Sequence, residues 1–263
     1  MSRKALFFDV DGTLLSEITH EVPQSAVQAI RKARKKGHLV FINSGRVICH
    51  IGPIRDLVEA DGYLCGCGTY IVVEGEVLYS HRIPHERGVQ LKKEILAHGF
   101  DGVLEGAESC YFRDEPSWIP EVERLRTMIA QAGNMSPWGW EEDCYEYDKC
   151  CILADESSDR EGLFKVMEAD MDVIDRGSDF YECVPKGHSK ATAIAFVLKH
   201  YGIPLKEAYV FGDSTNDLSM FEYAENTILM GKHDKELEPY ASFITKTVEE
   251  DGIAYAMEKL GLI

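Results

Sequence analysis

The sequence predicts an α/β protein in which a Rossmann-like parallel sheet is interrupted by an inserted α+β domain. Short apolar runs alternate with amphipathic stretches in residues 1–82, which is typical of a parallel sheet covered by helices. The same alternation resumes in residues 184–263. Residues 83–183 are richer in glutamate and turn residues and contain all three tryptophans. We therefore expect the two outer segments to form one domain and the middle segment to form a second.

Residues 1–82 show buried strands separated by helices. Apolar residues at near-helical spacing, such as Val27 and Ile30, indicate a first helix that should end at Gly37. The turn at Gly75 predicts a β-hairpin. The expected elements are strands at Ala5–Phe8, His38–Asn43 and Tyr63–Cys65, helices at Gln24–Lys36 and Val47–Leu57, and hairpin strands at Tyr70–Val73 and Glu76–Ser80.

The middle and last segments differ in the order of their elements. In residues 83–183 we expect helices at Glu86–His98, Ile119–Gln131 and Asp159–Glu168, with strands at Ser109–Arg113, Lys149–Ala154, Asp172–Asp175 and Phe180–Val184. In residues 184–263 we expect helices at Ser189–Tyr201, Leu218–Tyr223 and Gly252–Leu260, with strands at Ala208–Phe211 and Thr227–Met230. The last segment therefore returns to the βα alternation of the first.

The net charge restricts the class of partner. The chain carries 45 acidic and 28 basic side chains, a formal net charge of −17. A field of this sign repels nucleic acid and anionic lipid, so we expect neither as a partner. It also repels a phosphorylated metabolite, so a phosphate site in this chain must supply its own local positive charge.

The cysteines and the N-terminus indicate the compartment. Cys65-x-Cys67 and Cys150-Cys151 lack the spacing of a zinc knuckle or a CxxC redox pair, so we expect reduced, buried thiols. The apolar run Ala5–Val10 is short and interrupted by Asp9, unlike a targeting signal. No stretch approaches the roughly 18 apolar residues of a membrane span. We expect a cytoplasmic protein.

Four polar clusters stand at the ends of predicted strands or at the starts of the helices that follow. In an open parallel sheet the carboxyl ends of the strands share one edge, and ligands bind there. We therefore expect these clusters to converge in space. They are Asp9–Thr13, Asn43–Arg46, Lys186–Lys190 and Gly212–Asp217.

The acidic residues of these clusters predict a metal site. Asp9 and Asp11 are two residues apart after a buried strand, so their side chains should point the same way. Two carboxylates this close repel each other unless a cation or a proton lies between them. Asp213 adds a third carboxylate. Three oxygen donors with room for water suit Mg²⁺, which is the expected cofactor.

The remaining residues of the clusters suit phosphate binding. Gly12 and Gly212 allow the backbone to approach a ligand closely. Ser44 and the amides of the following helix start, beginning at Gly45, can hold phosphate oxygens. Lys190 adds a positive charge on the first turn of its helix. Together with a metal ion, this lysine meets the requirement that the charge of −17 imposes.

At this point the motifs resemble a known superfamily. Asp9-Val10-Asp11-Gly12-Thr13 resembles the first motif, DxDGT, of the haloacid dehalogenase-like (HAD) superfamily. Ser44, Lys190 and Gly212-Asp213-x-x-x-Asp217 match its other three motifs in the same order. Residues 83–183 resemble the α/β (type C2) cap of the Cof-type branch, whose members dephosphorylate sugar phosphates and related metabolites. The resemblance implies a Mg²⁺-dependent phosphatase acting on a small phosphorylated metabolite.

The resemblance also implies a role for each motif residue. Asp9 would be the nucleophile, forming an aspartyl-phosphate, and Asp11 would act first as general acid and then as general base. The other implied roles are Mg²⁺ ligation by the Asp9 carboxylate, the Asp11 carbonyl and Asp213, support of that shell by Asn216 and Asp217, and phosphoryl binding by Ser44, Gly45 and Lys190.

Two alternative functions remain open. A phosphomutase would need the same groups, whereas a catalytically silent binding protein is disfavoured because every required side chain is present.

Some residues have structural alternatives. Taken singly, each cluster could be a turn or a helix cap, Arg46 could brace its loop and His188 could be structural. The sequence departs from the Cof-type pattern at Cys67, where that branch usually carries asparagine.

Overall fold

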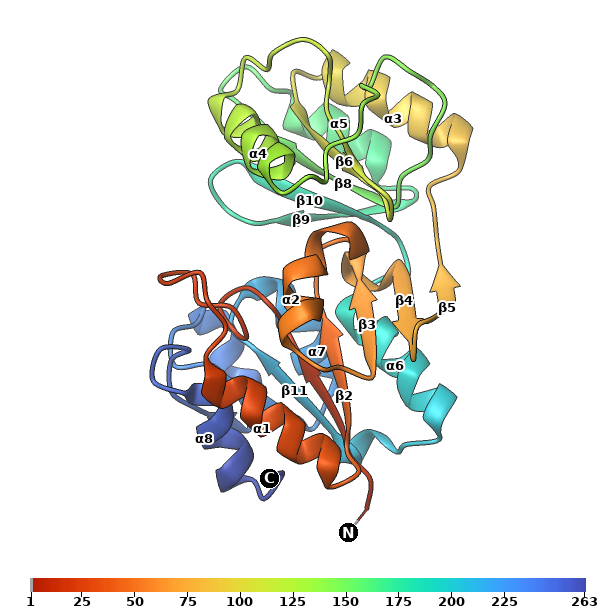
Figure 1. Cartoon of the computed structure of the whole chain (residues 1–263). Helices are drawn as coiled ribbons and strands as arrows, with labels where there is room; N and C mark the ends of the chain where they lie inside the picture. Colours follow the sequence, from red (N-terminus) through yellow and green to blue (C-terminus); the bar gives the residue numbers. More distant parts are fainter. Residues whose placement is uncertain (1) are drawn as a thin grey trace. The chain divides into compact units, whose positions relative to one another are not determined.

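The computed structural model describes residues 2–263, which divide into two compact units (Figure 1). The first unit comprises residues 2–45, 51–79 and 189–263. The second comprises residues 46–50 and 80–188. No helix among the described residues is long and apolar enough to span a lipid bilayer.

The first unit is built on an eight-stranded sheet with the order β13-β12-β11-β1-β2-β3-β4-β5. Every pair from β13 to β3 is parallel, and β3 pairs with β4 in the antiparallel sense. Its strands are β1 (Ala5–Phe8), β2 (Leu39–Asn43), β3 (Gly62–Cys65), β4 (Tyr70–Val73), β5 (Glu76–Ser80), β11 (Ala208–Gly212), β12 (Asn226–Leu229) and β13 (Phe243–Ile244).

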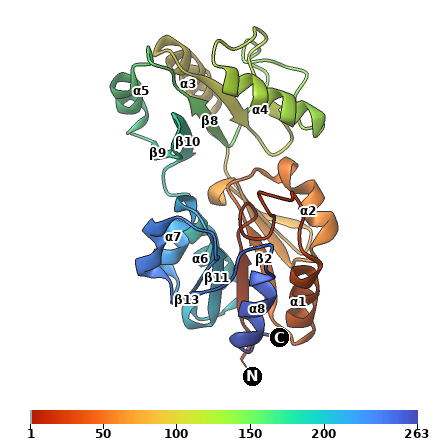
Figure 2. The same ribbon diagram turned by 90° about the vertical axis from the view of Figure 1, so that its left-hand side faces the viewer.

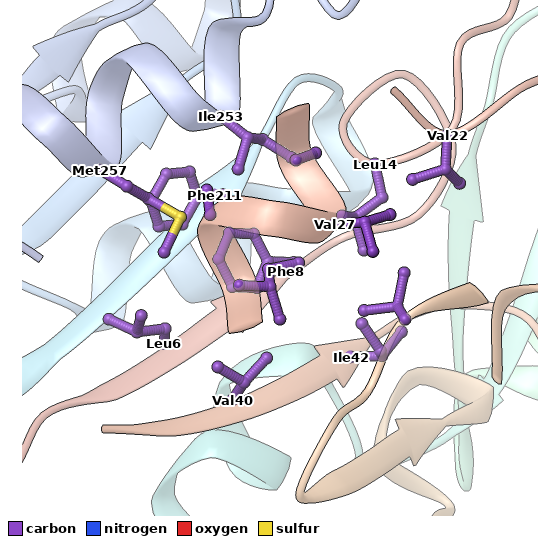
Figure 3. Packing of buried hydrophobic residues seen from close by; sticks show 14 of the residues in the cluster. Leu6, Phe8, Leu14, Val22, Val27, Val40, Ile42, Phe211, Ile253 and Met257 are labelled. Atoms are coloured by element: carbon purple, nitrogen blue, oxygen red, sulfur yellow. The ribbon is translucent and has the colours of Figure 1, made fainter. Parts of the chain in front are cut away.

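Helices cover both faces of this sheet (Figure 2). On one face Leu6 and Phe8 pack with residues of α1 and α8, including Val27 and Met257 (Figure 3). On the other face Phe7 packs against residues of α6 and α7. The helices are α1 (Gln24–Lys35), α2 (Gly52–Leu57), α6 (Lys190–Tyr201), α7 (Leu218–Tyr223) and α8 (Gly252–Lys259). Burial on both faces explains why the strand sequences read as continuous apolar runs.

The strand order determines which loops meet. β1 lies between β2 and β11 and is parallel to both, with Phe8 opposite Ile42 on one side and Phe211 on the other. The carboxyl ends of these three strands therefore lie side by side. The loops that follow them begin at Asp9, Ser44 and Asp213.

The second unit is a five-stranded antiparallel sheet with helices. The sheet order is β7-β6-β8-β10-β9. Helices α3 and α5 pack on one face, with Leu91 and Leu163 in the core, and α4 packs on the other through Val122 and Ile129. The elements are α3 (His85–Ala97), β6 (Asp101–Glu105), β7 (Cys110–Tyr111), α4 (Pro120–Gln131), β8 (Lys149–Leu153), α5 (Arg160–Met167), β9 (Met171–Asp175) and β10 (Phe180–Pro185).

The predicted helix at Val47–Leu57 is confirmed only in its second half. The segment forms a 3₁₀ turn at Ile48–Ile51 followed by the short helix α2, which begins at Gly52 with Pro53 in its first turn. Proline lacks an amide hydrogen and clashes with the preceding turn, so it kinks or breaks a helix that would otherwise continue through it. Residues 46–50 belong to the second unit, although the sequence placed them in the first domain, because Val47 packs in the apolar cluster that contains Phe112.

The sequence analysis missed the strands β6 and β13 and several short 3₁₀ helices, including the one at Lys235–Tyr240. β6 has the sequence Asp-Gly-Val-Leu-Glu, and its charged ends hide the strand pattern. Both ends are buried with cationic partners, since Arg113 lies 3.2 Å from Asp101 and Lys149 lies 2.8 Å from Glu105. Gly102 is required there because a Cβ atom would lie 2.1 Å from the Cys151 carbonyl oxygen.

Candidate active site

Three carboxylates gather at the carboxyl ends of β1 and β11. The oxygens of Asp9, Asp213 and Asp217 lie within 4.8 Å of one another, and all three residues are buried. Asp9 directly follows β1, and its amide donates to the Phe211 carbonyl of β11 at 3.0 Å. This backbone bond continues the pairing of the two strands by one residue and fixes the distance between their loops.

Lys190 lies between two members of this group, Asp9 and Asp217. Its Nζ is 2.6 Å from Asp9 Oδ1 and 2.5 Å from Asp217 Oδ1, and its side chain is fully buried. Ser189 caps α6 with its side chain, so Lys190 is the first residue of that helix. Asn43, at the end of β2, donates from Nδ2 to the Lys190 carbonyl at 3.1 Å. The lysine is thus held by a helix cap, by an adjacent strand and by two ion pairs.

The charges in this group do not balance. Burial raises the pKa of Asp9 to about 7, with Lys190 opposing the shift and Asp217 and Asp11 adding to it. Burial, reinforced by Asp9 and Asp217, raises the pKa of Asp213 to about 8, while a hydrogen bond from Thr13 opposes this. Burial disfavours the charged form of Lys190, but the two carboxylates outweigh it and raise the lysine pKa. The three carboxylates therefore carry more negative charge than the single lysine can balance.

Asp217 contacts Lys190 directly, which the sequence analysis did not predict. One of its oxygens contacts Lys190, and the other accepts from the amides of Asp213 and Ser214 at 2.9 and 3.3 Å. Asn216 lies beside it, with Oδ1 3.4 Å from Lys190 Nζ. Asp217 therefore joins the lysine to the loop that carries Asp213, where the family resemblance implied only support of a metal shell.

Two close approaches explain the glycines of the motifs. Gly12 has a φ of 78°, and a Cβ atom there would lie 2.2 Å from Asp213 Oδ2. A Cβ atom on Gly212 would lie 2.4 Å from Asp217 Oδ2. Thr13, to which the sequence analysis assigned no role, donates from Oγ1 to Asp213 Oδ1 at 2.7 Å. The position of Asp213 therefore depends on the lack of a side chain at residue 12 and on the hydroxyl group at residue 13.

Asp11, Ser44 and Gly45 lie on the loops that border this group. Asp11 is partly buried and its backbone pairs with Leu15. Ser44 is buried, its amide donates to the Leu64 carbonyl at 2.8 Å, and its carbonyl accepts from Cys67 at 3.2 Å. These backbone bonds hold the loop after β2 at the same sheet edge as the loop after β1.

Cys67 adopts a left-handed conformation, with φ 54° and ψ 36°. Asparagine tolerates this region better than other residues with a Cβ, which explains its frequent use at this position in the Cof-type branch. Cys67 is buried and forms the bond to Ser44 through its backbone. In this chain a cysteine therefore forms the left-handed turn, with its side chain buried.

The donor set fits a hard divalent cation. All the available donors are oxygens, which Mg²⁺ prefers. Burial, with the neighbouring carboxylates adding to it, raises the pKa values of Asp9 and Asp213. A pocket of about 140 Å³, lined in part by Gly12, Asp213 and Ser214, borders the group. Mg²⁺ usually keeps several water ligands, and this pocket offers room for them.

Comparisons with known proteins agree with this geometry. The family described as haloacid dehalogenase-like hydrolase matches residues 6–257. The chain is 29% identical over 265 residues to "Putative phosphatase YkrA" of Bacillus subtilis, covering 100% of both chains.

Two solved structures share the fold over almost the whole chain. The sugar phosphatase BT4131 is 28% identical with a TM-score of 0.82, covering 99% of this chain and 100% of that one. The phosphatase BT1666 from Bacteroides thetaiotaomicron is 28% identical with a TM-score of 0.84, covering 99% of this chain and 96% of that one. Family match, sequence identity and fold all extend over both units, so the chain belongs to the haloacid dehalogenase-like hydrolase family.

Proposed function

We propose that this protein is a Mg²⁺-dependent phosphatase that hydrolyses a phosphate monoester of a small metabolite through an aspartyl-phosphate on Asp9. The observation that carries the proposal is the buried group of Asp9, Asp213 and Asp217 around Lys190. This group has more carboxylates than positive charges. A bound cation would therefore allow the Asp9 carboxylate, the nucleophile, to approach the negatively charged phosphate ester. Asp9, Asp213 and the Asp11 carbonyl would hold Mg²⁺, which supplies the positive charge that lets two anions meet.

The first half of the reaction transfers the phosphoryl group to Asp9. Lys190 holds Asp9 Oδ1, which leaves Oδ2 to form a bond to phosphorus while the bond from phosphorus to the ester oxygen breaks. Asp11 donates its proton to that departing oxygen, and the alcohol leaves. Lys190 and the loop at Ser44 and Gly45 bind the charge that spreads over the phosphoryl oxygens.

The second half returns the enzyme to its starting state. Asp11, now ionised, accepts a proton from a water molecule whose oxygen attacks phosphorus. The bond between phosphorus and Asp9 breaks, inorganic phosphate is released, and the Asp9 carboxylate is restored. Asp11 is again protonated and ready for the next ester.

For the substrate we propose a polyhydroxylated sugar phosphate. The support is the likeness to BT4131, which is described as a sugar phosphatase. A phosphomutase is the second candidate on the same residues, because it would form the same intermediate on Asp9 and pass it to a second hydroxyl group.

The proposal is tested by phosphate release from a panel of sugar phosphates, nucleotides and an aryl phosphate. We expect release that requires Mg²⁺ and stops on addition of EDTA. With labelled substrate, a phosphatase yields free labelled phosphate and a mutase yields label on a second sugar hydroxyl. Release that is unaffected by EDTA would contradict the metal assignment, and no turnover of any substrate would favour a silent binding protein.

The unfolding temperature should depend on both pH and Mg²⁺. The pKa values of Asp9 and Asp213, about 7 and 8, lie above their ordinary value of 3.8, so the metal-free fold holds protons that the unfolded chain releases. This contribution to stability is complete below about pH 4 and is lost as the pH rises through 7 and 8. Mg²⁺ replaces those protons. We expect the gain in unfolding temperature on adding Mg²⁺ to be larger at about pH 8.5 than at about pH 5.5.

Thermal unfolding with Mg²⁺ or EDTA at both pH values checks this expectation. Asp213→Asn removes one of the two titrating groups and should reduce the difference between the two pH values. An equal Mg²⁺ effect at both pH values in the wild-type protein would argue against ion binding by these carboxylates.

Gly12→Ala should damage the metal site more than the fold. The added methyl group would meet Asp213 Oδ2 at 2.2 Å, so the carboxylate must move. Gly37 is a matched control, because its φ of 88° is equally strained for alanine but nothing lies within 4 Å of the added atom. Both variants should lose about 1 kcal/mol of stability from backbone strain.

Only Gly12→Ala should weaken Mg²⁺ binding and lower phosphate release, by about tenfold or more each. Mg²⁺ titration of activity for both variants measures the difference. If Gly37→Ala lost as much activity as Gly12→Ala, backbone strain rather than contact with Asp213 would be the cause.

A further inference from the structure

Two thiols and an imidazole meet in the second unit, at a place that the proposed reaction does not use. Cys49, His50 and Cys110 each offer one ligand atom, and these atoms lie within 4.8 Å of one another. His50 Nε2 is 3.0 Å from Cys110 Sγ. Cys110 is buried, and Cys49 and His50 are partly buried. A sulfur and nitrogen donor set of this kind is typical of sites for borderline and soft metal ions.

The backbone holds all three residues in ordered segments. Cys49 and His50 are neighbours in the 3₁₀ turn at Ile48–Ile51, where the His50 amide donates to the Val47 carbonyl at 2.9 Å. Cys110 begins β7, and its amide donates to the Asn134 carbonyl at 2.9 Å. The ligand atoms therefore come from a turn and a strand that are both held by main-chain hydrogen bonds.

The separations are close to those of a tetrahedral zinc site. Zn–S distances of about 2.3 Å and Zn–N distances of about 2.0 Å require sulfur and nitrogen ligands to be about 3.5 Å apart, and two sulfurs about 3.8 Å apart. The observed 3.0 Å between nitrogen and sulfur, and the upper limit of 4.8 Å for every pair, bracket these values.

The carboxylate of Glu105 lies near the second ring nitrogen of His50. Glu105 Oε1 lies 3.8 Å from His50 Nδ1, and Glu105 Oε2 is held 2.8 Å from Lys149. Histidine ligands of metals almost always donate their second ring nitrogen to a carboxylate, a carbonyl or a water molecule, which fixes the tautomer. With Nδ1 directed to Glu105, Nε2 is the nitrogen that faces Cys110 and is available to a metal ion.

We propose that Cys49, His50 and Cys110 form a Zn²⁺ site with an open fourth position for a water molecule or an external ligand. This site differs in chemistry from the aspartate group of the first unit, which offers only oxygen donors and suits Mg²⁺. A hydrogen bond between the imidazole and one thiol would account for His50 and Cys110 alone. It does not by itself bring in Cys49, whose thiol donates to the Gly106 carbonyl at 3.5 Å and still lies within 4.8 Å of the other two ligand atoms.

Cobalt substitution in the whole wild-type protein tests the proposal directly. The reduced protein is saturated with Mg²⁺, so that the aspartate group is occupied, and is then titrated with Co²⁺. Thiolate ligands give an intense charge-transfer band in the near ultraviolet, which carboxylate ligands do not give. We expect this band to saturate at about one equivalent and to disappear when Zn²⁺ is added.

Variants identify the ligands. Cys49→Ser and Cys110→Ser should each weaken Zn²⁺ binding by more than about 100-fold, and Glu105→Gln by about 10-fold. Cys144→Ser is the matched control, because Cys144 is an exposed cysteine of the same unit and lies outside the cluster. Competition with a chromophoric chelator measures the affinities, and circular dichroism shows whether each variant is folded.

Two results would overturn the proposal. One is a wild-type protein that takes up Co²⁺ without a thiolate band. The other is a folded pair of Cys49→Ser and Cys110→Ser variants that bind Zn²⁺ as tightly as the Cys144→Ser control. If the two variants fail to fold, the wild-type cobalt spectrum decides alone. Asp9→Asn should leave the band unchanged, which separates this site from the aspartate group.

Discussion

Asp9→Asn is expected to lower the rate of phosphate release by about 10⁴-fold or more. The amide keeps the shape of the side chain but is a very poor nucleophile and a weaker ligand for a cation. It also leaves Lys190, whose Nζ lies 2.6 Å from Asp9 Oδ1, with only Asp217 as a close carboxylate partner. Steady-state release of inorganic phosphate with saturating Mg²⁺ measures the effect.

The control for this substitution is Asp56→Asn, which changes an exposed aspartate of α2 in the same unit. It should leave the rate within about twofold, because Asp56 is exposed and does not belong to the group of Asp9, Asp213 and Asp217. Circular dichroism and the unfolding temperature show whether both variants are folded. A folded Asp9→Asn protein that retains turnover would remove Asp9 as the nucleophile and with it the aspartyl-phosphate mechanism.

Lys190→Met is expected to lower both stability and activity. The side chain is fully buried between Asp9 and Asp217, and removing one partner of a buried ion pair costs about 3–5 kcal/mol because the other charge is left uncompensated. The rate should fall by about 10³-fold, since the charge that binds the transferring phosphoryl group is lost. Urea unfolding and phosphate release measure the two effects separately.

The stability loss should be partly recovered by a second change. Lys190→Met combined with Asp217→Asn removes a carboxylate together with the cation, so the double variant should be more stable than Lys190→Met alone. Lys199→Met, on the exposed last turn of the same helix, is the control and should cost less than about 1 kcal/mol. If Lys190→Met were as stable as Lys199→Met, the two ion pairs would not hold the site together.

The main features of the first unit could be predicted from local sequence pattern. Strands such as Ala5–Phe8 are buried on both faces, so their composition alone reveals them. β6 could not be found in this way, because Asp101 and Glu105 are charged and become buried only with partners from other segments. The 3₁₀ turn before α2 was missed because its sequence is apolar at near-helical spacing and only Pro53 breaks it.

The candidate site was predictable in its members but not in their contacts. The motif residues Asp9, Lys190 and Asp213 were found because their spacing places each at the end of a strand or the start of a helix. No local pattern shows that Asp217 pairs with Lys190, or that Thr13 donates to Asp213. Those contacts depend on the order and register of β11, β1 and β2, which pair segments far apart in the chain.

The amino-acid sequence by itself determined the βα pattern, the separate composition of the middle segment, and the presence of every acid and base that the proposed reaction needs. Each of these follows from short-range rules of burial, turn chemistry and motif spacing. Tertiary structure alone decided that Asp9, Asp213 and Asp217 come together, with Lys190 paired to two of them. It also decided that Cys49 and His50 meet Cys110, although 60 residues separate His50 from it. The physical reason is that such contacts depend on which strands and turns pack together. The local sequence around one residue therefore does not reveal which distant residue it will contact in the folded protein.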